Sequence, residues 1–177
     1  MRLVLVIVVA SSVSAAVIGC GVGSSVEIPP RAETASTMEC SKYTLSKEPD
    51  GAIGVIAARE AANHGEPIVV VGRIGGVANP WIEGRAAFTL LDASVDVVPE
   101  GTEGKPGAIC TGDCCACERA ASMTLVKLVD ENGQLIAVDA RQLLGVAAND
   151  VVVIHGKANK DQRGNLVVLA DGVFIRR

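Results

Sequence analysis

Four cysteines lie within one short segment, Cys110-Thr-Gly-Asp-Cys114-Cys115-Ala-Cys117. Thiolates spaced this closely can surround one tetrahedral zinc ion, and they also suit Cu⁺, because both ions accept soft sulfur ligands. The repeated Cys-x-x-Cys pair of a zinc ribbon is absent from the segment. The cysteines therefore predict a site for zinc or copper without matching a known zinc motif.

The same cysteines are also suited to structural disulfides. Four cysteines allow three pairings, and disulfides persist in proteins exported to an oxidising compartment. Cys114 and Cys115 are adjacent, so each pairs more easily with a cysteine elsewhere than with the other. Cys40 adds an odd thiol, which either stays free or pairs with the cluster. A thiol–disulfide redox role is a third alternative, although no Cys-x-x-Cys motif stands beside a βαβ pattern.

The first 20 residues have the order of an export signal. Arg2 supplies a positive charge, residues 3–9 form an unbroken apolar run, and small residues lead to Val17-Ile18-Gly19-Cys20. The apolar part is shorter than the ~20 residues that a membrane-spanning helix needs. We therefore predict a signal peptide over residues 1–19.

This order resembles a bacterial lipoprotein signal, in which an aliphatic residue, a small spacer and Gly precede the modified Cys. The resemblance implies cleavage before Cys20 and lipidation of its side chain. It also implies an exported protein held at the periplasmic face of a membrane, since several acyl chains anchor a protein stably. Gly21 in place of Asp favours the outer membrane.

Residues 20–50 are predicted to be a flexible tether. They contain Gly, Ser, Thr and a pair of prolines, and they have no apolar period. A flexible coil of this length spans on the order of 30 Å, enough to hold a domain clear of a membrane. Loss of the signal removes one basic residue, Arg2, and makes the formal net charge of −4 more negative. This charge argues against nucleic acid and anionic lipid headgroups as electrostatic partners.

Short aliphatic runs separated by turn residues dominate the rest of the chain. The clearest region is 67–93, where two runs flank a glycine-rich loop. Asn132-Gly133 between apolar runs predicts a β-hairpin. Strands are predicted over residues 68–71, 85–91, 124–129, 134–138, 151–154, 166–169 and 173–175. A helix leading into these strands is predicted over 51–66 with Asp50 as its cap, and a short helix from Asp139 to Leu144 with Gly145 as its stop.

Strand, strand, strand, short helix, strand, strand is the order of an OB-fold barrel. Residues 67–177 resemble the OB-fold domains of exported bacterial proteins, including the tRNA-anti-codon-like group, through VVVGRIGG at 69–76, AFTLLD at 87–92 and VVVIHGKANKD at 151–161. The whole chain also resembles a family of uncharacterised membrane-anchored lipoproteins with the same helix, barrel and Cys-rich insert over 99–121. The resemblance predicts a mainly β fold class, but the chain has more strand runs than a five-stranded barrel uses.

The OB resemblance implies a ligand face on the second and third strands, flanked by two loops. Here those loops would be 77–84, with Asn79, Trp81 and Glu83, and 156–165, with Lys157, Lys160 and Arg163. Binding of single-stranded nucleic acid needs a basic groove and several stacking rings. Aromatic residues are only 2% of this chain, and Trp81 is the one ring expected at the surface, where a lid on the barrel mouth is the alternative interpretation. Nucleic acid is therefore disfavoured as a partner.

No catalytic motif stands out in the sequence. There is no Gly-x-Ser-x-Gly, no phosphate-binding loop and no His-Glu-x-x-His, and His155 is expected to be structural. We therefore predict a non-catalytic, lipid-anchored binding or scaffolding protein with a protein or small molecule as its unknown ligand. Metal binding through the four clustered cysteines and thiol–disulfide exchange are the alternatives.

Overall fold

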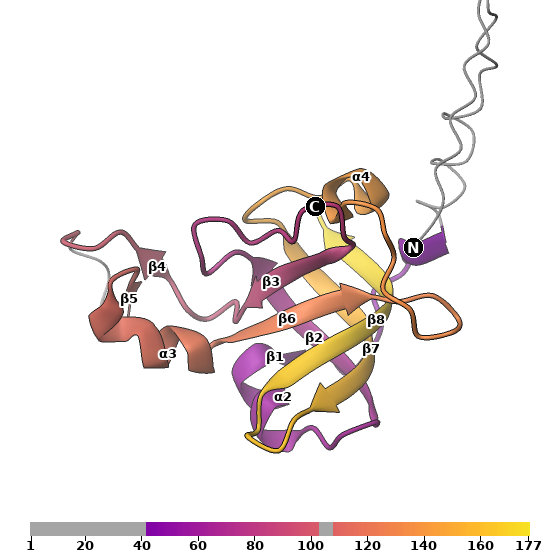
Figure 1. Cartoon of the computed structure of the whole chain (residues 1–177), viewed down its shortest axis with the longest axis horizontal. Coiled ribbons are helices and arrows are strands. Elements are labelled where there is room, and N and C mark those ends of the chain that lie inside the picture. The colour runs from indigo at the N-terminus through magenta and orange to yellow at the C-terminus, as the bar shows by residue number, and fades with distance from the viewer. Residues whose placement is uncertain (1–41, 103–107) are drawn as a thin grey trace, which may run out of the picture. The chain divides into compact units, whose positions relative to one another are not determined.

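The computed structural model describes residues 42–102 and 108–177. The predicted signal peptide, Cys20 and the predicted tether as far as residue 41 lie outside these ranges. The described chain is mainly β, with few short helices (Figure 1). None of the helices in these ranges combines the length and the apolar character that crossing a membrane requires.

Five strands close into a barrel: β2 (Pro67–Ile74), β3 (Ala87–Leu91), β6 (Met123–Leu128), β7 (Val151–Lys160) and β8 (Leu166–Arg176). Their order is β2-β3-β6-β8-β7, and β7 pairs with β2 again to close the sheet. Neighbouring strands are antiparallel except β6 and β8, which run parallel. This arrangement confirms the predicted fold class, a mainly β chain with a small OB-like barrel.

The barrel interior is aliphatic because alternate strand residues point inward. In β2 the inward side chains of Ile68, Val70 and Ile74 are buried, and those of Val69 and Val71 on the other face are half-buried. Gly72 lies inside β2, although the sequence suggested that it ends the run. A Cβ on this glycine would lie 2.6 Å from Cγ of Leu90, so Gly72 lets β2 and β3 approach closely instead of breaking the strand.

The two C-terminal strands are longer than predicted. Residues 156–160 continue β7 rather than belonging to a polar loop, and the two runs predicted at 166–169 and 173–175 form the single strand β8. His155 and Lys157 are exposed, whereas Gly156 and Ala158, which alternate with them, are buried. The polar residues that suggested a loop therefore lie on the solvent-exposed face of a strand. A register shift between His155 and Gly156 bends the pair without ending it.

The predicted hairpin at Asn132-Gly133 has a turn but no returning strand. Asp130 Oδ1 accepts hydrogen bonds from the N–H of Asn132 at 2.9 Å and of Gln134 at 2.8 Å, which fixes the turn. After the turn, Val129 and Leu135 form only an isolated bridge. The strand predicted over 134–138 is therefore wrong. Its absence from the described barrel, together with the joining of the last two predicted runs into β8, accounts for the five barrel strands.

Two helices lie beside the barrel. α2 (Val55–Ala61) is shorter than the predicted range 51–66 and follows β1 (Ile53–Gly54), which pairs parallel with β2. Asp50 does not cap α2; Asp92 Oδ2 accepts the N–H of Ile56 at 2.9 Å instead. α4 (Ala140–Leu144) has the predicted caps: the side chain of Asp139 accepts the N–H of Arg141, and Gly145 ends the helix at φ 65°.

The last part of the predicted tether lies against the barrel. Tyr43 is buried, and the N–H of Leu45 donates to the carbonyl oxygen of Val173 on β8 at 2.8 Å. Glu48 accepts from the guanidinium of Arg176 near the C-terminus. Any tether in this protein therefore ends before residue 43.

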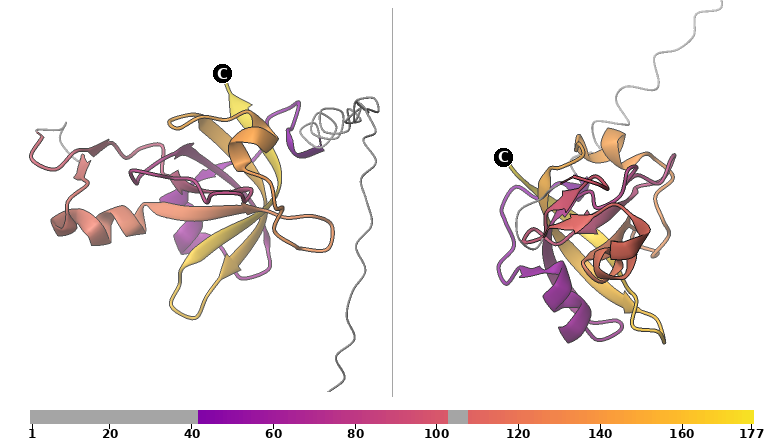
Figure 2. Two further views of the ribbon diagram at one scale, coloured as in Figure 1. Left: turned by 45° about the horizontal axis from the view of Figure 1, so that its top comes forward. Right: turned by 90° about the vertical axis from the view of Figure 1, so that its left-hand side faces the viewer.

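The Cys-rich insert forms a small unit between β3 and β6. It contains the parallel pair β4 (Val97–Val98) and β5 (Ile109–Cys110), the 3-10 helix η1 (Asp113–Cys115) and α3 (Ala116–Ala121). Figures 1 and 2 show this unit projecting from the side of the barrel, so its cysteines are presented away from the aliphatic core.

Candidate metal centre

Successive elements of the insert position the four clustered cysteines. β5 carries Cys110, η1 carries Cys114 and Cys115, and α3 carries Cys117. β5 is fixed by hydrogen bonds from the N–H of Ile109 to the carbonyl oxygen of Asp96 at 2.8 Å and from the N–H of Thr111 to that of Val98 at 2.9 Å. The turn at Gly112 then directs η1 back toward β5.

Three sulfur atoms converge on one point. The Sγ of Cys110 lies 3.2 Å from the Sγ of Cys114 and 3.0 Å from that of Cys115, and the last two are 3.7 Å apart. All four cysteines in the described ranges are free thiols. Cys110 and Cys115 are partly buried, whereas Cys114 is exposed, so the cluster opens to solvent at the surface of the insert.

The spacing of these sulfurs is close to that of a bound soft metal ion. A tetrahedral Zn²⁺ with bonds of about 2.3 Å separates its sulfur ligands by about 3.8 Å. The distance between Cys114 and Cys115 is close to this value, whereas the two distances from Cys110, 3.0 and 3.2 Å, are shorter, so the side chain of Cys110 would have to move outward to admit an ion. In the described part of the chain, the group of ligand atoms within 4.8 Å of one another holds only Cys110, Cys114 and Cys115.

Arg119 on α3 holds the loop that carries the cluster. Its guanidinium Nη1 donates to the carbonyl oxygen of Cys110 at 2.6 Å and to that of Gly112 at 3.2 Å. These two bonds connect α3 with the end of β5 and with the turn before η1. They orient Cys110 toward Cys114 and Cys115, as the outer partners of metal ligands commonly do.

The neighbouring thiols shift the acidity of the cluster in opposite directions. The thiols of Cys115 and Cys114 and the N–H of Gly112 lower the pKa of Cys110, although desolvation and the carboxylate of Glu100 oppose them. Hydrogen bonds with Cys110 and Cys115 raise the pKa of Cys114 to about 11. Cys110 is therefore the first of these two residues to become a thiolate, and a bound cation would be needed to hold three thiolates together at neutral pH.

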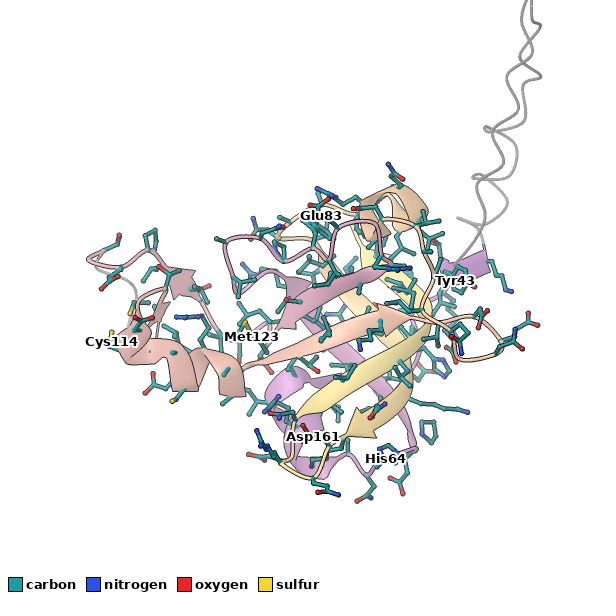
Figure 3. The ribbon with its side chains drawn as sticks, in the orientation of Figure 1. Tyr43, His64, Glu83, Cys114, Met123 and Asp161 are labelled. Carbon is teal, nitrogen blue, oxygen red and sulfur yellow. The ribbon has the colours of Figure 1, made fainter. Side chains whose placement is uncertain are left out.

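Cys117 is separate from the other three cysteines. It is exposed on α3, and its sulfur is not part of the converging group. Figure 3 shows Cys114 at the far end of the insert, well away from Met123, where the chain enters β6. The four-cysteine set predicted from the sequence is thus divided into three converging thiols and one outlying thiol.

The two predicted ligand loops lie at opposite ends of β2. The register pairs Pro67 with Lys157 and Arg73 with Val151, so loop 161–165 lies near the start of β2 and loop 77–84 follows its end. Figure 3 agrees, with Glu83 and Asp161 at opposite ends of the barrel. The structure does not bring the residues of the two loops together.

Trp81 lies beside β3, where it forms an isolated antiparallel bridge with Phe88. Its ring meets Phe88 edge-on, with ring centroids 6.0 Å apart, and it packs against the core. The guanidinium carbon of Arg141 lies 5.5 Å from the centroid of the Trp81 ring. The same guanidinium forms ion pairs with Asp139 and Glu83. This packing favours the lid interpretation of Trp81 over an exposed binding ring, whereas Asn79 and Glu83 on the same loop are exposed.

The predicted basic residues are divided between a strand and a turn. Lys157 and Lys160 lie in β7, and Arg163 lies in the exposed turn that follows. The Nζ of Lys160 donates to the carbonyl oxygens of Arg59 at 2.7 Å and Ala62 at 3.3 Å, at the end of α2. Lys160 thus connects the end of α2 to strand β7 of the barrel through these hydrogen bonds.

Comparison with known proteins identifies no relative of this chain: no protein-family model and no curated protein matches the sequence.

Sequence reasoning missed Arg119 as a positioning residue. A basic residue two positions after the last cysteine was visible in the sequence, but its contact with Cys110 depends on α3 folding back toward β5. It also missed Asp92, whose role as the cap of α2 depends on tertiary packing.

Proposed function

We propose that this protein is a non-catalytic, membrane-anchored barrel protein that binds a soft metal ion, zinc or copper, through Cys110, Cys114 and Cys115. The observation that carries the proposal is the convergence of three free thiols to within 3.7 Å of one another. Soft thiolate ligands select Cu⁺ and Zn²⁺ over Mg²⁺ or Ca²⁺, which prefer oxygen.

The barrel acts as the scaffold in this proposal. Its interior is filled by buried aliphatic side chains, and Trp81 packs against this core. The insert follows β3 and leads into β6, and the N–H of Asp92 after β3 donates to the carbonyl oxygen of Ser122 before β6 at 2.9 Å. A ligand of the barrel itself, either a protein or a small molecule, stays a prediction.

Elemental analysis of the full chain tests the metal proposal. We expect about one equivalent of zinc or copper in protein purified under reducing conditions, and loss of that metal when Cys110, Cys114 and Cys115 are all replaced by Ser. Cys40→Ser is the matched control and should retain the ion. Metal well below one equivalent, or disulfides among the three cysteines in protein isolated without reductant, would contradict the proposal.

The anchor is proposed from the resemblance of residues 1–20 to a lipoprotein signal. We expect the native chain to fractionate with membranes, at the outer membrane, and to incorporate labelled fatty acid. Cys20→Ser should abolish both the label and the cleavage before residue 20, because the acylated sulfur is missing. Unchanged labelling of the Ser variant would show that Cys20 is not the anchor.

A further inference from the structure

We infer that the cluster holds Cu⁺ in a three-coordinate site formed by Cys110, Cys114 and Cys115, with Cys117 outside the coordination shell. This inference rests on the proposed function, because it names which soft metal the cluster takes and with how many ligands. It goes beyond the sequence pattern, which offers four equivalent thiols for one tetrahedral ion.

The number of converging ligands separates the two metals. Structural Zn²⁺ sites in proteins are almost always four-coordinate and tetrahedral. The cluster supplies three sulfur atoms, and within the described ranges no Asp, Glu, His or fourth Cys completes it. Cu⁺ has no such need, because a soft d¹⁰ ion with one positive charge is satisfied by three thiolates in a plane.

The two histidines of the chain are held elsewhere. His64 accepts the backbone N–H of Lys160 at 3.2 Å beside the end of α2, and His155 pairs with Asp171 across β7 and β8. Both belong to the barrel rather than to the insert. The usual nitrogen ligand of a mixed Cys and His zinc site is therefore not supplied by this insert.

Cys117 lies outside the sulfur cluster in this structure. It is on α3, and its sulfur is not among the three ligand atoms that lie within 4.8 Å of one another. Cys114 and Cys117 are three residues apart along η1 and α3, a spacing that places residues on the same helix face, so the Cys117→Ser variant is the direct test of its exclusion. The two bonds from Arg119 to the carbonyls of Cys110 and Gly112 fix α3 against the loop that carries the cluster.

The binding step needs no electron transfer. Three thiols lose three protons as three Cu–S bonds form, and copper enters and stays as Cu⁺. The resulting centre carries two negative charges. The guanidinium of Arg119, bonded to the Cys110 carbonyl, lies beside that charge and helps to offset it.

The test is an anaerobic Cu⁺ titration of the full-length protein in detergent, in competition with a Cu⁺-specific chelator, together with X-ray absorption at the copper edge. We expect one Cu⁺ per chain and three sulfur neighbours. Cys110→Ser, Cys114→Ser and Cys115→Ser should each weaken Cu⁺ binding by more than the ~100-fold that loss of an outer-shell partner can reach. Cys117→Ser and Cys40→Ser should each change the affinity by less than about threefold.

The outcomes distinguish this inference from the function on which it rests. Four sulfur neighbours, or a Cys117→Ser variant that loses Cu⁺ as strongly as Cys110→Ser, would overturn the three-coordinate site while leaving soft-metal binding intact. Tight Zn²⁺ binding with no measurable Cu⁺ binding would also overturn the Cu⁺ site and leave soft-metal binding intact. Failure to bind either ion would instead overturn the proposed function itself.

Discussion

The guanidinium of Arg119 donates to the carbonyl oxygen of Cys110 at 2.6 Å, and this bond joins α3 to the strand that presents the first cysteine of the cluster. A second bond reaches the carbonyl of Gly112. Arg119 touches no sulfur in these contacts, so it is a positioning residue that determines where Cys110 lies relative to Cys114 and Cys115.

Replacing Arg119 by Met should weaken metal binding without removing a ligand. Met keeps the apolar stem but has no N–H donors, so the loop from Cys110 to Gly112 loses its support. Loss of such an outer partner typically costs ~10- to 100-fold in metal affinity. A chelator competition with Cu⁺ and with Zn²⁺ measures the change.

Arg163→Met is the control for this substitution, because Arg163 lies in the exposed turn after β7, far from the insert in the sequence. It should leave the affinity unchanged. Arg119→Lys should restore part of the affinity, since a single ammonium can still reach one carbonyl oxygen. Equal metal affinity of the Arg119→Met variant and the native chain would show that Arg119 does not position the metal ligands.

Asp92→Ala should destabilise the fold. The buried carboxylate accepts the N–H of Ile56 at 2.9 Å, and also the N–H and hydroxyl of Ser94. Loss of a helix cap costs typically ~1 kcal/mol, and the unpaired buried donors add to this cost. Thermal unfolding measures the effect, and Asp50→Ala is the matched control, because the exposed Asp50 does not cap α2.

The contribution of Asp92 should disappear in acid. Burial raises the pKa of this carboxyl, but hydrogen bonds from Ser94, Ile56 and Val55 outweigh burial and lower it. Because the pKa is lower in the folded protein, the ionised carboxylate stabilises the fold at pH values above its unfolded pKa of ~3.9. This stabilisation is lost as the pH falls through the folded pKa. The stability difference between native protein and Asp92→Asn should therefore be large at pH 7 and shrink as the pH falls below the unfolded pKa of ~3.9 and through the lower folded pKa. A difference that grows in acid would contradict this assignment.

Much of the fold could be predicted because the strand runs carry their own pattern. The alternation of Ile68, Val70 and Ile74 marks the inner face of β2, and Asp139 with Gly145 marks both ends of α4. The length of β7 could not be predicted in this way. His155 and Lys157 are polar because one face of the strand is exposed to solvent, and polarity alone does not distinguish such a face from a loop.

The candidate site could be predicted only as a group of cysteines. Their spacing indicated a soft-metal or disulfide site, but not that Cys117 stands apart from the other three. That division depends on the turn at Gly112 and on the direction of α3. The capping of α2 by Asp92 could not be predicted from the sequence either. Ile56 and Asp92 are 36 residues apart in the chain and meet only after β2 and β3 pair.

Gly156→Ala should be strongly destabilising. A Cβ at this position would meet the carbonyl oxygen of Leu169 and would lie 2.8 Å from Cα of Ala170, both backbone atoms of β8. Backbone cannot move aside as a flexible side chain can, so the cost should reach the upper end of the ~1–3 kcal/mol seen for overpacked sites. Chemical denaturation measures the free energy of unfolding.

Gly164→Ala is the comparison for Gly156→Ala. Gly164 has open space around its Cα and a φ of 80°, so Ala there meets only the strain of a left-handed backbone, about 1 kcal/mol. The variant at Gly156 should therefore unfold at the lower denaturant concentration. The reverse order would show that β7 and β8 separate more easily at the register shift than their close approach implies.

Trp81→Ala should lower stability more than substitution of its neighbour Ile82. Trp81 packs edge-on against the buried Phe88 and lies under the guanidinium of Arg141, so its loss removes both contacts. For a half-buried ring we expect a cost of about 2 kcal/mol, below the 3–5 kcal/mol of a fully buried Trp. Ile82 is 45% exposed, and Ile82→Ala should change stability by less than about 0.5 kcal/mol.

Trp81→Phe should recover most of the stability lost in Trp81→Ala, because it keeps a ring over Phe88. If Trp81→Ala were as stable as Ile82→Ala, the ring would not be a lid, and a role for Trp81 as an exposed binding platform would regain support.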